Sequence, residues 1–223
     1  MNILVVYAHH EPASLTGSLK NVAVSTLTSQ GHQVVETDLY ASGFHPVANK
    51  YDFTTLSGGH FNYMLEQKHA SDNDWAFSPD IVEEIQKLRA ADIVLFYTPI
   101  WWFSVPAILK GWFDRVLAMG VAWDGGKIYE AGLLRGKKAM ITAVAGGPEE
   151  FYQPLNKHRA TLKQILHPVH HGTLAFCGMD VLEPFMVHSS MNKSAEDYAT
   201  LLDSHKAVID TLVENPHYLS KYS

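Results

Sequence analysis

The chain has 223 residues, a formal net charge of −6 with neutral histidines, and only 18% charged residues. This length suits a single domain over residues 1–223, and 11% aromatic residues excludes a disordered chain. Net acidity argues against a general nucleic-acid binder, which needs a basic face to release counterions. One cysteine, Cys177, excludes a disulfide framework, and no apolar run could span a bilayer. We therefore expect a cytoplasmic protein with neither a signal peptide nor a transmembrane segment.

The first forty residues predict a β-α-β unit. Ile3–Tyr7 is a continuous apolar run, typical of a buried parallel strand. Apolar residues at helical spacing over Leu15–Leu27 predict a helix that Gly31 closes, and His32–Thr37 predicts a second strand. The irregular segment 38–74 is long enough to be functional or to contain short helices.

Further strands and helices alternate along the rest of the chain. Ser78 and Pro79 predict a helix start, Ile93–Tyr97 predicts a third strand, and Pro106 is expected to begin the next helix. We then expect a fourth strand at Lys137–Val144 and a mostly helical region at Tyr152–Leu166. A fifth strand is expected at Gly172–Phe176, an edge strand at Val181–Val187 and a final helix at Ser194–Val213. This alternation favours an α/β fold, with a flavodoxin-like, doubly wound parallel sheet of five strands flanked by helices.

Ligands of an open α/β sheet bind at the carboxyl ends of its strands, where three loops are expected to meet. The loop 9–16 leads into a helix N-terminus that could bind phosphate, although Ser14 also fits a plain N-cap. This loop lacks the GxGxxG and GxxxxGK[ST] patterns, which argues against a dinucleotide Rossmann site or a nucleotide triphosphatase. The consecutive aromatics of Trp101–Phe103 could form a wall for a flat ligand, an aromatic plug or a dimer contact.

The third loop pairs Gly146 and Gly147, which allow close approach of the backbone to a ligand. Tyr152 and His158 follow, and their polar groups could stabilise negative charge on a flavin. Taken alone, the two residues fit a packing role and a surface role better.

A histidine cluster lies further along the chain. The spacing of His167, His170 and His171 could hold a metal ion, but no carboxylate or cysteine lies nearby and Pro168 disturbs the helix. We favour packing or surface roles and predict no metal site. Cys177 is expected to be a buried, inert thiol.

The stretch Ser104–Val116, preceded by Pro99–Phe103, resembles the NAD(P)H:quinone oxidoreductase (DT-diaphorase-like) family of flavoproteins, and the chain looks like a short, bacterial-type member. Further matches are Glu36–Tyr40, Ser78–Ile81, Phe176–Gly178 and Val181–Pro184. The resemblance covers nearly the whole chain. It implies FAD rather than FMN, NADH or NADPH as co-substrate, a quinone or related acceptor, and a homodimer with two sites at its interface.

The resemblance also implies roles for individual residues. Tyr152 and His158 match the pair thought to assist hydride transfer, and the implied substrate-binding residues are Trp102, Trp123, Gly125 and Phe176. The implied cofactor-binding residues are His9, Ser14, Leu15, Thr16, Pro99, Ile100, Trp101, Trp102, Phe103, Asp114, Val144, Ala145, Gly146, Gly147 and Tyr152.

Three departures from the family pattern bear on the site. Val144 and Ala145 stand where the family often has two threonines, so contacts there must be made by backbone or be absent. Trp123 and Gly125 stand where the family places two tyrosines that cover the substrate from the neighbouring subunit, so the substrate range should differ. The chain ends at Ser223, without the C-terminal segment of longer animal members, so the preference between NADH and NADPH stays open.

These features favour a two-electron reductase with ping-pong kinetics, in which NAD(P)H and a quinone use one pocket in turn. Two other functions stay open, a flavin-binding regulatory subunit of a potassium-efflux system and an FMN-containing, flavodoxin-like electron carrier. The helix after Pro106 has apolar residues on more than one face, which predicts a C2 homodimer. Its apolar residues are Ile108, Leu109, Trp112, Phe113 and Val116.

Overall fold

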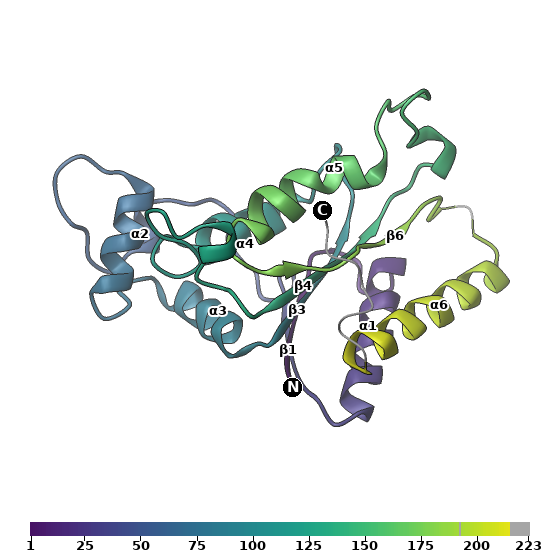
Figure 1. Cartoon of the computed structure of the whole chain (residues 1–223), viewed down its shortest axis with the longest axis horizontal. Helices are drawn as coiled ribbons and strands as arrows, with labels where there is room; N and C mark the ends of the chain where they lie inside the picture. The colour runs from purple at the N-terminus through teal and green to yellow at the C-terminus, as the bar shows by residue number, and fades with distance from the viewer. Residues whose placement is uncertain (192, 215–223) are drawn as a thin grey trace.

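The computed structural model describes residues 1–191 and 193–214 (Figure 1). Their strands are β1 (Asn2–Tyr7), β2 (Gln33–Asp38), β3 (Ile93–Pro99), β4 (Lys138–Val144), β5 (Asp180–Val181) and β6 (Phe185–Val187). The α-helices are α1 (Leu15–Ser29), α2 (Tyr63–Asp72), α3 (Pro79–Ala90), α4 (Ala107–Val116), α5 (Leu162–Val169) and α6 (Ala195–Glu214). Shorter helical turns are η1 (Lys50–Asp52), η2 (Tyr129–Ala131), η3 (Glu149–Phe151) and η4 (His170–Ala175). Ser223 lies outside the described residues.

The strands form one parallel sheet in the order β2-β1-β3-β4-β5, and β6 also pairs with β4. This order, with helices on both faces, is that of a flavodoxin-like doubly wound fold, so the predicted fold class is confirmed. Such a sheet binds ligands where its strand order reverses, at the carboxyl ends of β1 and β3. No helix among the described residues combines the length and apolarity needed to cross a bilayer.

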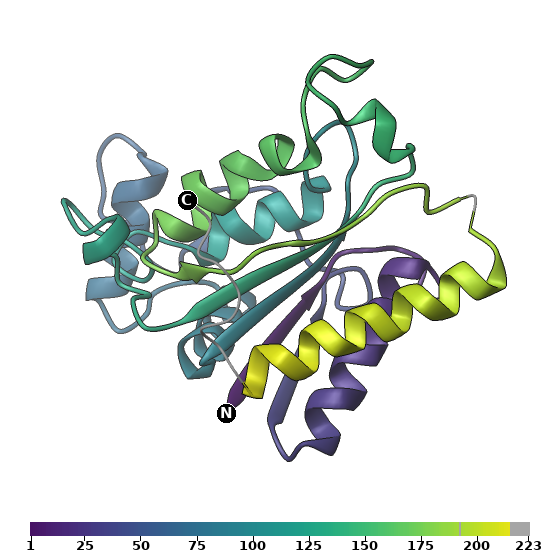
Figure 2. The ribbon, with the colours of Figure 1, turned by 45° about the vertical axis from the view of Figure 1, so that its right-hand side comes forward.

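Two apolar layers enclose the sheet (Figure 2). Helices α3, α4 and α5 pack on one face, where Leu4 and Val6 of β1 are buried. Helices α1 and α6 cover the other face, which buries Ile3 and Val5. Successive strand side chains point to opposite faces, so an apolar run such as β1 can be buried on both.

Arg115 of α4 fixes the segment between β2 and α3. Its guanidinium group pairs with both carboxylate oxygens of Asp52, at 3.2 and 3.0 Å, and with Asp80 at 2.9 Å. Tyr63, the first residue of α2, donates its hydroxyl to Asp52 at 2.6 Å. Helix α2 is therefore held against α4, and segment 38–74 contains short helices, as its length predicts.

Two predicted elements are wrong, and a third is divided in two. Most of the predicted helical region Tyr152–Leu166 is irregular, because the helix begins only at Leu162, where Thr161 and Gln164 form a reciprocal capping box. The predicted strand Gly172–Phe176 is a π-helical turn that continues α5, since a short apolar run does not distinguish strand from helix. The predicted edge strand Val181–Val187 is two short strands, β5 and β6.

Candidate active site

The loop between β1 and α1 presents hydrogen-bond donors at the carboxyl edge of the sheet. Ser14 caps α1, and its hydroxyl accepts the N–H of Gly17 at 3.1 Å. Leu15 and Thr16 begin the helix, so their N–H groups have no intrahelical acceptor. This helix N-terminus has the donors and the partial positive charge that favour a phosphate.

His9 adds a directed donor to this loop. Its Nδ1 accepts the N–H of Glu11 at 3.0 Å, so the neutral ring carries its proton on Nε2. Burial and the stacked ring of His10, with centroids 4.7 Å apart, lower the pKa of His9. A neutral imidazole that donates from Nε2 can bind a phosphate oxygen. His10 was not predicted as a site residue.

A strained turn lies at the end of β3. Trp101 and Ser104 exchange two backbone hydrogen bonds, at 2.9 and 3.1 Å, which closes a two-residue turn. Its central residues, Trp102 and Phe103, both have positive φ, 50° and 59°, a conformation that large side chains rarely adopt. The turn leaves Trp102 96% exposed. The turn therefore presents the Trp102 ring to solvent instead of packing it in the core.

The ends of β3 and β4 lie side by side and carry four predicted residues. Pro99 pairs with Val144, and Ile100 donates its N–H to the carbonyl of Val144 at 2.8 Å. The N–H of Ala145 is taken by the carbonyl of Val187 at 2.8 Å. Both Val144 and Ala145 have buried side chains. The carbonyl of Val144 and the N–H of Ala145 are therefore already hydrogen-bonded within the chain.

Those residues bring the predicted catalytic pair together. A Cβ on Gly147 would lie 3.3 Å from the ring of Tyr152, a tight contact, so the absence of a side chain favours this close approach. A Cβ on Gly146 would meet only a distant sulfur atom. The ring of His158 lies 4.7 Å from that of Tyr152 and packs edge-on against Phe103 at 5.0 Å. The loop after β3, which carries Phe103, thus meets the loop after β4, which carries His158, as predicted.

Burial raises the pKa of the Tyr152 phenol, which keeps it protonated and able to donate a hydrogen bond. A third aromatic polar residue, His188, lies 5.2 Å from the Tyr152 ring, and burial lowers its pKa. His188 was not predicted as a site residue. Its position directly after β6, at the carboxyl end of a strand, is the signal that could have identified it.

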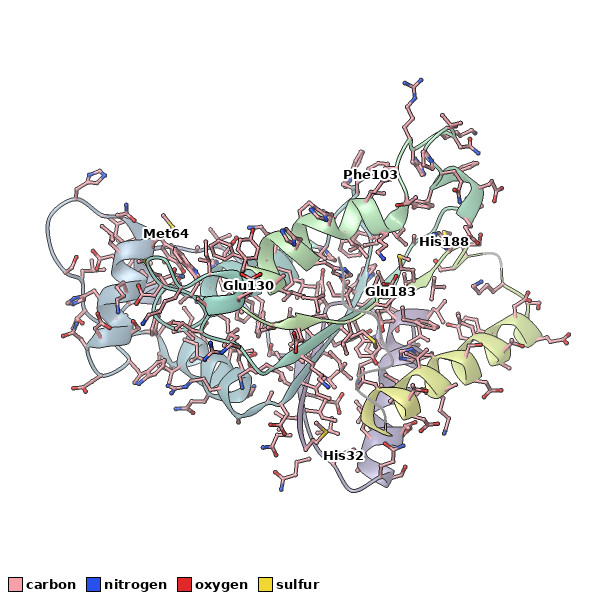
Figure 3. The ribbon with its side chains drawn as sticks, in the orientation of Figure 1. His32, Met64, Phe103, Glu130, Glu183 and His188 are labelled. Atoms are coloured by element: carbon pink, nitrogen blue, oxygen red, sulfur yellow. The ribbon has the colours of Figure 1, made fainter. Side chains whose placement is uncertain are left out.

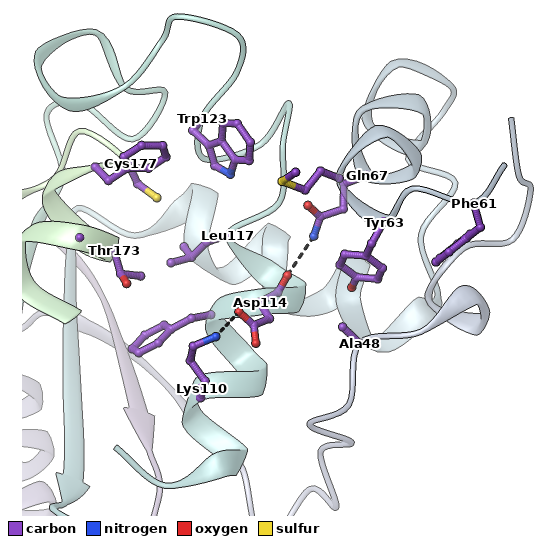
Figure 4. Close-up of a pocket in the computed structure, with 14 residues that line it drawn as sticks. Ala48, Phe61, Tyr63, Gln67, Lys110, Asp114, Leu117, Trp123, Thr173 and Cys177 are labelled. Atoms are coloured by element: carbon purple, nitrogen blue, oxygen red, sulfur yellow. Dashed lines mark hydrogen bonds and ion pairs between the residues drawn. The ribbon is translucent and has the colours of Figure 1, made fainter. Parts of the chain in front are cut away.

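Trp123, Phe176 and Asp114 line a different hollow, a pocket of about 520 Å³ that α2 and α4 border (Figure 4). Trp123 and Phe176 pack edge to face there, with ring centroids 5.7 Å apart. Asp114 lies on α4 in an ion pair with Lys110. Gly125 does not line the pocket, and a Cβ on it would meet open space.

The two groups of site residues are separated along the molecule. Figure 3 labels Phe103 and His188 on one side and Met64, which lines the pocket, on the other. Ring contacts join Trp123 to Phe176 and Tyr152 to His158, and neither Tyr152 nor His158 lines the pocket. The chain alone therefore does not assemble all the predicted residues into one site.

The apolar stripe of α4 does not provide a face for a partner. Leu109, Trp112, Phe113 and Val116 are buried within the chain, so this reason for predicting a homodimer is wrong. The helix packs beside α3 in the same apolar layer, and Ile108 is partly buried against that layer. Exposed apolar residues occur instead beside the pocket, at Phe61, Met64 and Leu65.

The histidine cluster lies within and just before η4. His170 is buried, and desolvation lowers its pKa to about 4, while the rings of His167 and His171 stack 5.2 Å apart. Among residues 1–191 and 193–214, no three potential metal ligands gather. Cys177 is buried, and desolvation raises the pKa of its thiol to about 12, as expected of an inert cysteine.

The sheet order and the helix N-terminus at its switch point define a flavodoxin-like α/β protein. Residues 1–211 match the family model described as flavodoxin-like fold. The human ribosyldihydronicotinamide dehydrogenase [quinone] is 47% identical over 184 residues, 82% of this chain and 79% of that protein. The rat NAD(P)H dehydrogenase [quinone] 1 is 38% identical over 223 residues, 99% of this chain and 81% of that protein.

A crystal structure from Klebsiella pneumoniae, named as a quinone reductase, superposes with a TM-score of 0.92 at 36% identity, covering 99% of this chain and 86% of that one. The chain belongs to the flavodoxin-like family and, within it, to the NAD(P)H:quinone oxidoreductases. The resemblance inferred from Ser104–Val116 is confirmed, and so is the expectation of an oxidoreductase.

Proposed function

We propose that the chain is an FAD-dependent NAD(P)H dehydrogenase (quinone) that works by a ping-pong reaction. The observation that carries the proposal is the meeting of Phe103, Gly147, Tyr152 and His158 at the carboxyl edge of the sheet. The N-terminus of α1, whose free N–H groups favour a phosphate, lies at the same edge. The names of the human and rat relatives support the same reaction.

The residues at this edge fit a flavin nucleotide. The Nε2–H of His9 and the first N–H groups of α1 are suited to the phosphates. The exposed ring of Trp102 and the backbone of Gly146 and Gly147 are suited to the flat ring system and its polar edge. The choice of FAD over FMN rests on the family resemblance.

A bound flavin would supply the redox chemistry, accepting a hydride from NAD(P)H and passing it to a quinone. Tyr152, protonated because burial raises its pKa, would donate a hydrogen bond to negative charge at the ring edge. His158 is held between the rings of Tyr152 and Phe103, where its imidazole can give up or take a proton. Trp102 would confine NAD(P)H and the quinone, in turn, to the same space.

We also propose a C2 homodimer that completes the substrate pocket. Trp123 and Phe176 line the hollow beside α2, and Tyr152 and His158 of the same chain do not line it. A second copy could place this hollow against the flavin edge of the first, and two-fold symmetry would then form two such sites. The exposed apolar residues beside the hollow support burial there.

The two alternative functions, an FMN-containing electron carrier and a regulatory subunit of a potassium-efflux system, are not favoured. An FMN electron carrier docks a redox partner and needs no walled pocket, whereas Trp102 and the Trp123–Phe176 pair are suited to enclose a small aromatic molecule. The named relatives are dehydrogenases rather than regulatory subunits of potassium efflux.

The proposal is tested on the purified holoprotein. Mass spectrometry of the released chromophore should give FAD, and stopped-flow mixing with NADH and NADPH should show flavin reduction followed by reoxidation with a quinone. Tyr152→Phe and His158→Gln should each slow reduction by about one to two powers of ten, since a charge-stabilising hydrogen bond contributes about 1.5–3 kcal/mol.

Tyr198→Phe on α6 is the matched control, because it deletes a phenol hydroxyl on the other side of the sheet. Finding FMN would reject the choice of cofactor, and finding no flavin after reconstitution would reject the function. If both variants bind FAD normally and their flavin is reduced at the parent rate, Tyr152 and His158 do not have the role assigned to them. Light scattering that gives a monomer mass for the holoprotein at micromolar concentration would reject the dimer.

A further inference from the structure

One face of α2 holds the loop that carries Trp123. Gln67 donates its amide N–H to the carbonyl of Asp114 at 2.9 Å and accepts the N–H of Met119 at 3.2 Å (Figure 4). It therefore joins the end of α4 to the start of the loop. Ser71, one turn further along α2, lies so close to Gly120 that a Cβ there would come within 2.0 Å of its hydroxyl oxygen.

Lys68 supplies the charged contact of this face. Its ammonium group pairs with Asp124 at 3.2 Å and with Asp72 of its own helix at 2.7 Å. Asp124 also accepts the N–H of Gly125 at 2.8 Å, and this bond together with Lys68 lowers the pKa of the Asp124 carboxyl. The carboxylate is thus held in place from two sides, directly after Trp123 in the chain.

Trp123 is fixed from its other side as well. Its carbonyl accepts the N–H of Gly120 at 2.7 Å, and its ring packs edge-on against Phe176. The chain on both sides of the indole is therefore bonded to α2, through Met119 and Gln67 before it and through Asp124 and Lys68 after it. The pocket wall that Trp123 and Phe176 form is held as a preorganised surface.

We propose that Lys68 is a positioning residue that sets which acceptors fit, by holding Trp123 as a rigid wall of the quinone pocket. This inference rests on the proposed function, since it takes Trp123 as a substrate contact. When the Trp123 wall is fixed, a small acceptor stays in contact with the indole. The same indole restricts the binding of larger fused-ring acceptors. Releasing Asp124 should let the wall move, which weakens binding of the small acceptor and relaxes the limit on the large one.

The test compares steady-state kinetics of Lys68→Met holoprotein with 1,4-benzoquinone and with the larger 2-methyl-1,4-naphthoquinone. The ratio of the two KM values, benzoquinone over naphthoquinone, should rise roughly two- to fivefold, the range that a partly exposed ion pair can contribute. kcat should change less than KM, because Tyr152 and His158 lie outside this pocket. Lys68→Arg should restore the parent ratio, and Asp124→Asn should reproduce the Lys68→Met value.

Lys206→Met is the matched control, because it breaks an exposed ion pair with Asp210 on α6, on the other side of the sheet. The proposal would be overturned if the KM ratio of Lys68→Met equalled that of the parent, or if Lys206→Met changed the ratio by the same factor. Hydrogen exchange of residues 119–125 gives a readout that needs no activity and should be faster in Lys68→Met. If the parent fails to reduce quinones, the proposed function fails, while unchanged exchange overturns the positioning role by itself.

Discussion

Acid sensitivity of the fold is expected at His205 of α6. The imidazole is fully buried, its Nε2 lies 3.0 Å from the hydroxyl of Tyr97, and the ring of Phe185 packs on it at 4.6 Å. Its Nδ1 has no hydrogen-bond partner among the described residues. Desolvation by burial lowers the pKa of His205 to about 4.

The shift predicts how stability depends on pH. In the unfolded chain the pKa of His205 is 6.5, so between pH 6.5 and 4 the unfolded state binds a proton that the folded state does not. Stability from this group is complete above pH 6.5 and is lost as the pH falls toward 4. One pKa unit corresponds to 1.36 kcal/mol, so the full loss is about 3 kcal/mol, of which about 2 kcal/mol falls between pH 7.5 and 5.

His205→Gln tests this prediction, because the amide does not titrate and can still bond with the Tyr97 hydroxyl. Urea unfolding of flavin-free protein should show that the variant loses about 2 kcal/mol less than the parent between pH 7.5 and 5. The exposed His60→Gln substitution is the control and should follow the parent curve. Equal losses in parent and His205→Gln would refute the reasoning. The buried His170 should leave a residual slope in both.

Three other substitutions have defined outcomes. Asp52→Asn leaves the buried Arg115 guanidinium without its main counter-charge and should lower the free energy of unfolding by about 3–5 kcal/mol in urea titrations. Gly132→Ala places a Cβ 2.3 Å from the backbone of Cys177, so the melting temperature should fall by several degrees. Trp102→Asn relieves left-handed strain and should raise stability by about 1 kcal/mol while flavin affinity, measured by fluorescence titration, falls.

Matched changes at less constrained positions are the controls. Asp80→Asn should cost less than Asp52→Asn, because Asp80 is half-exposed. Gly125→Ala should leave the melting temperature unchanged, since its Cβ would meet open space. Equal effects within either pair would contradict the structural reasons given, and so would tighter flavin binding by Trp102→Asn.

The parts of the fold that follow from local pattern were predictable. Ile93–Tyr97 is apolar on both faces and forms a central strand because both faces are covered. Gly172–Phe176 has a similar apolar run but continues a helix, since tertiary packing decides between the two for a short run. Tyr152–Leu166 is mostly irregular, because Pro154 lacks a backbone donor and Thr161 caps the helix later.

Contacts between distant residues were less predictable. Tyr152 and His158 were assigned from the family resemblance, because their positions alone favour packing and surface roles, and the structure brings their rings together. The Arg115–Asp52 pair joins residues 63 positions apart, and no periodicity or spacing indicates it. His188 was missed because the assignment of its strand was too coarse.

Helix α6 has a consequence for how the chain folds during synthesis. Its Ile209 packs with Leu19 and Leu27 of α1, and Asp210 accepts a hydrogen bond from Gln30, 180 positions earlier (Figure 2). The face of the sheet beside α1 therefore stays open to solvent until residues 195–214 have left the ribosome. At about 5–20 residues per second this delay is on the order of ten seconds or more, during which a nascent chain exposes an apolar face to chaperones and to its neighbours.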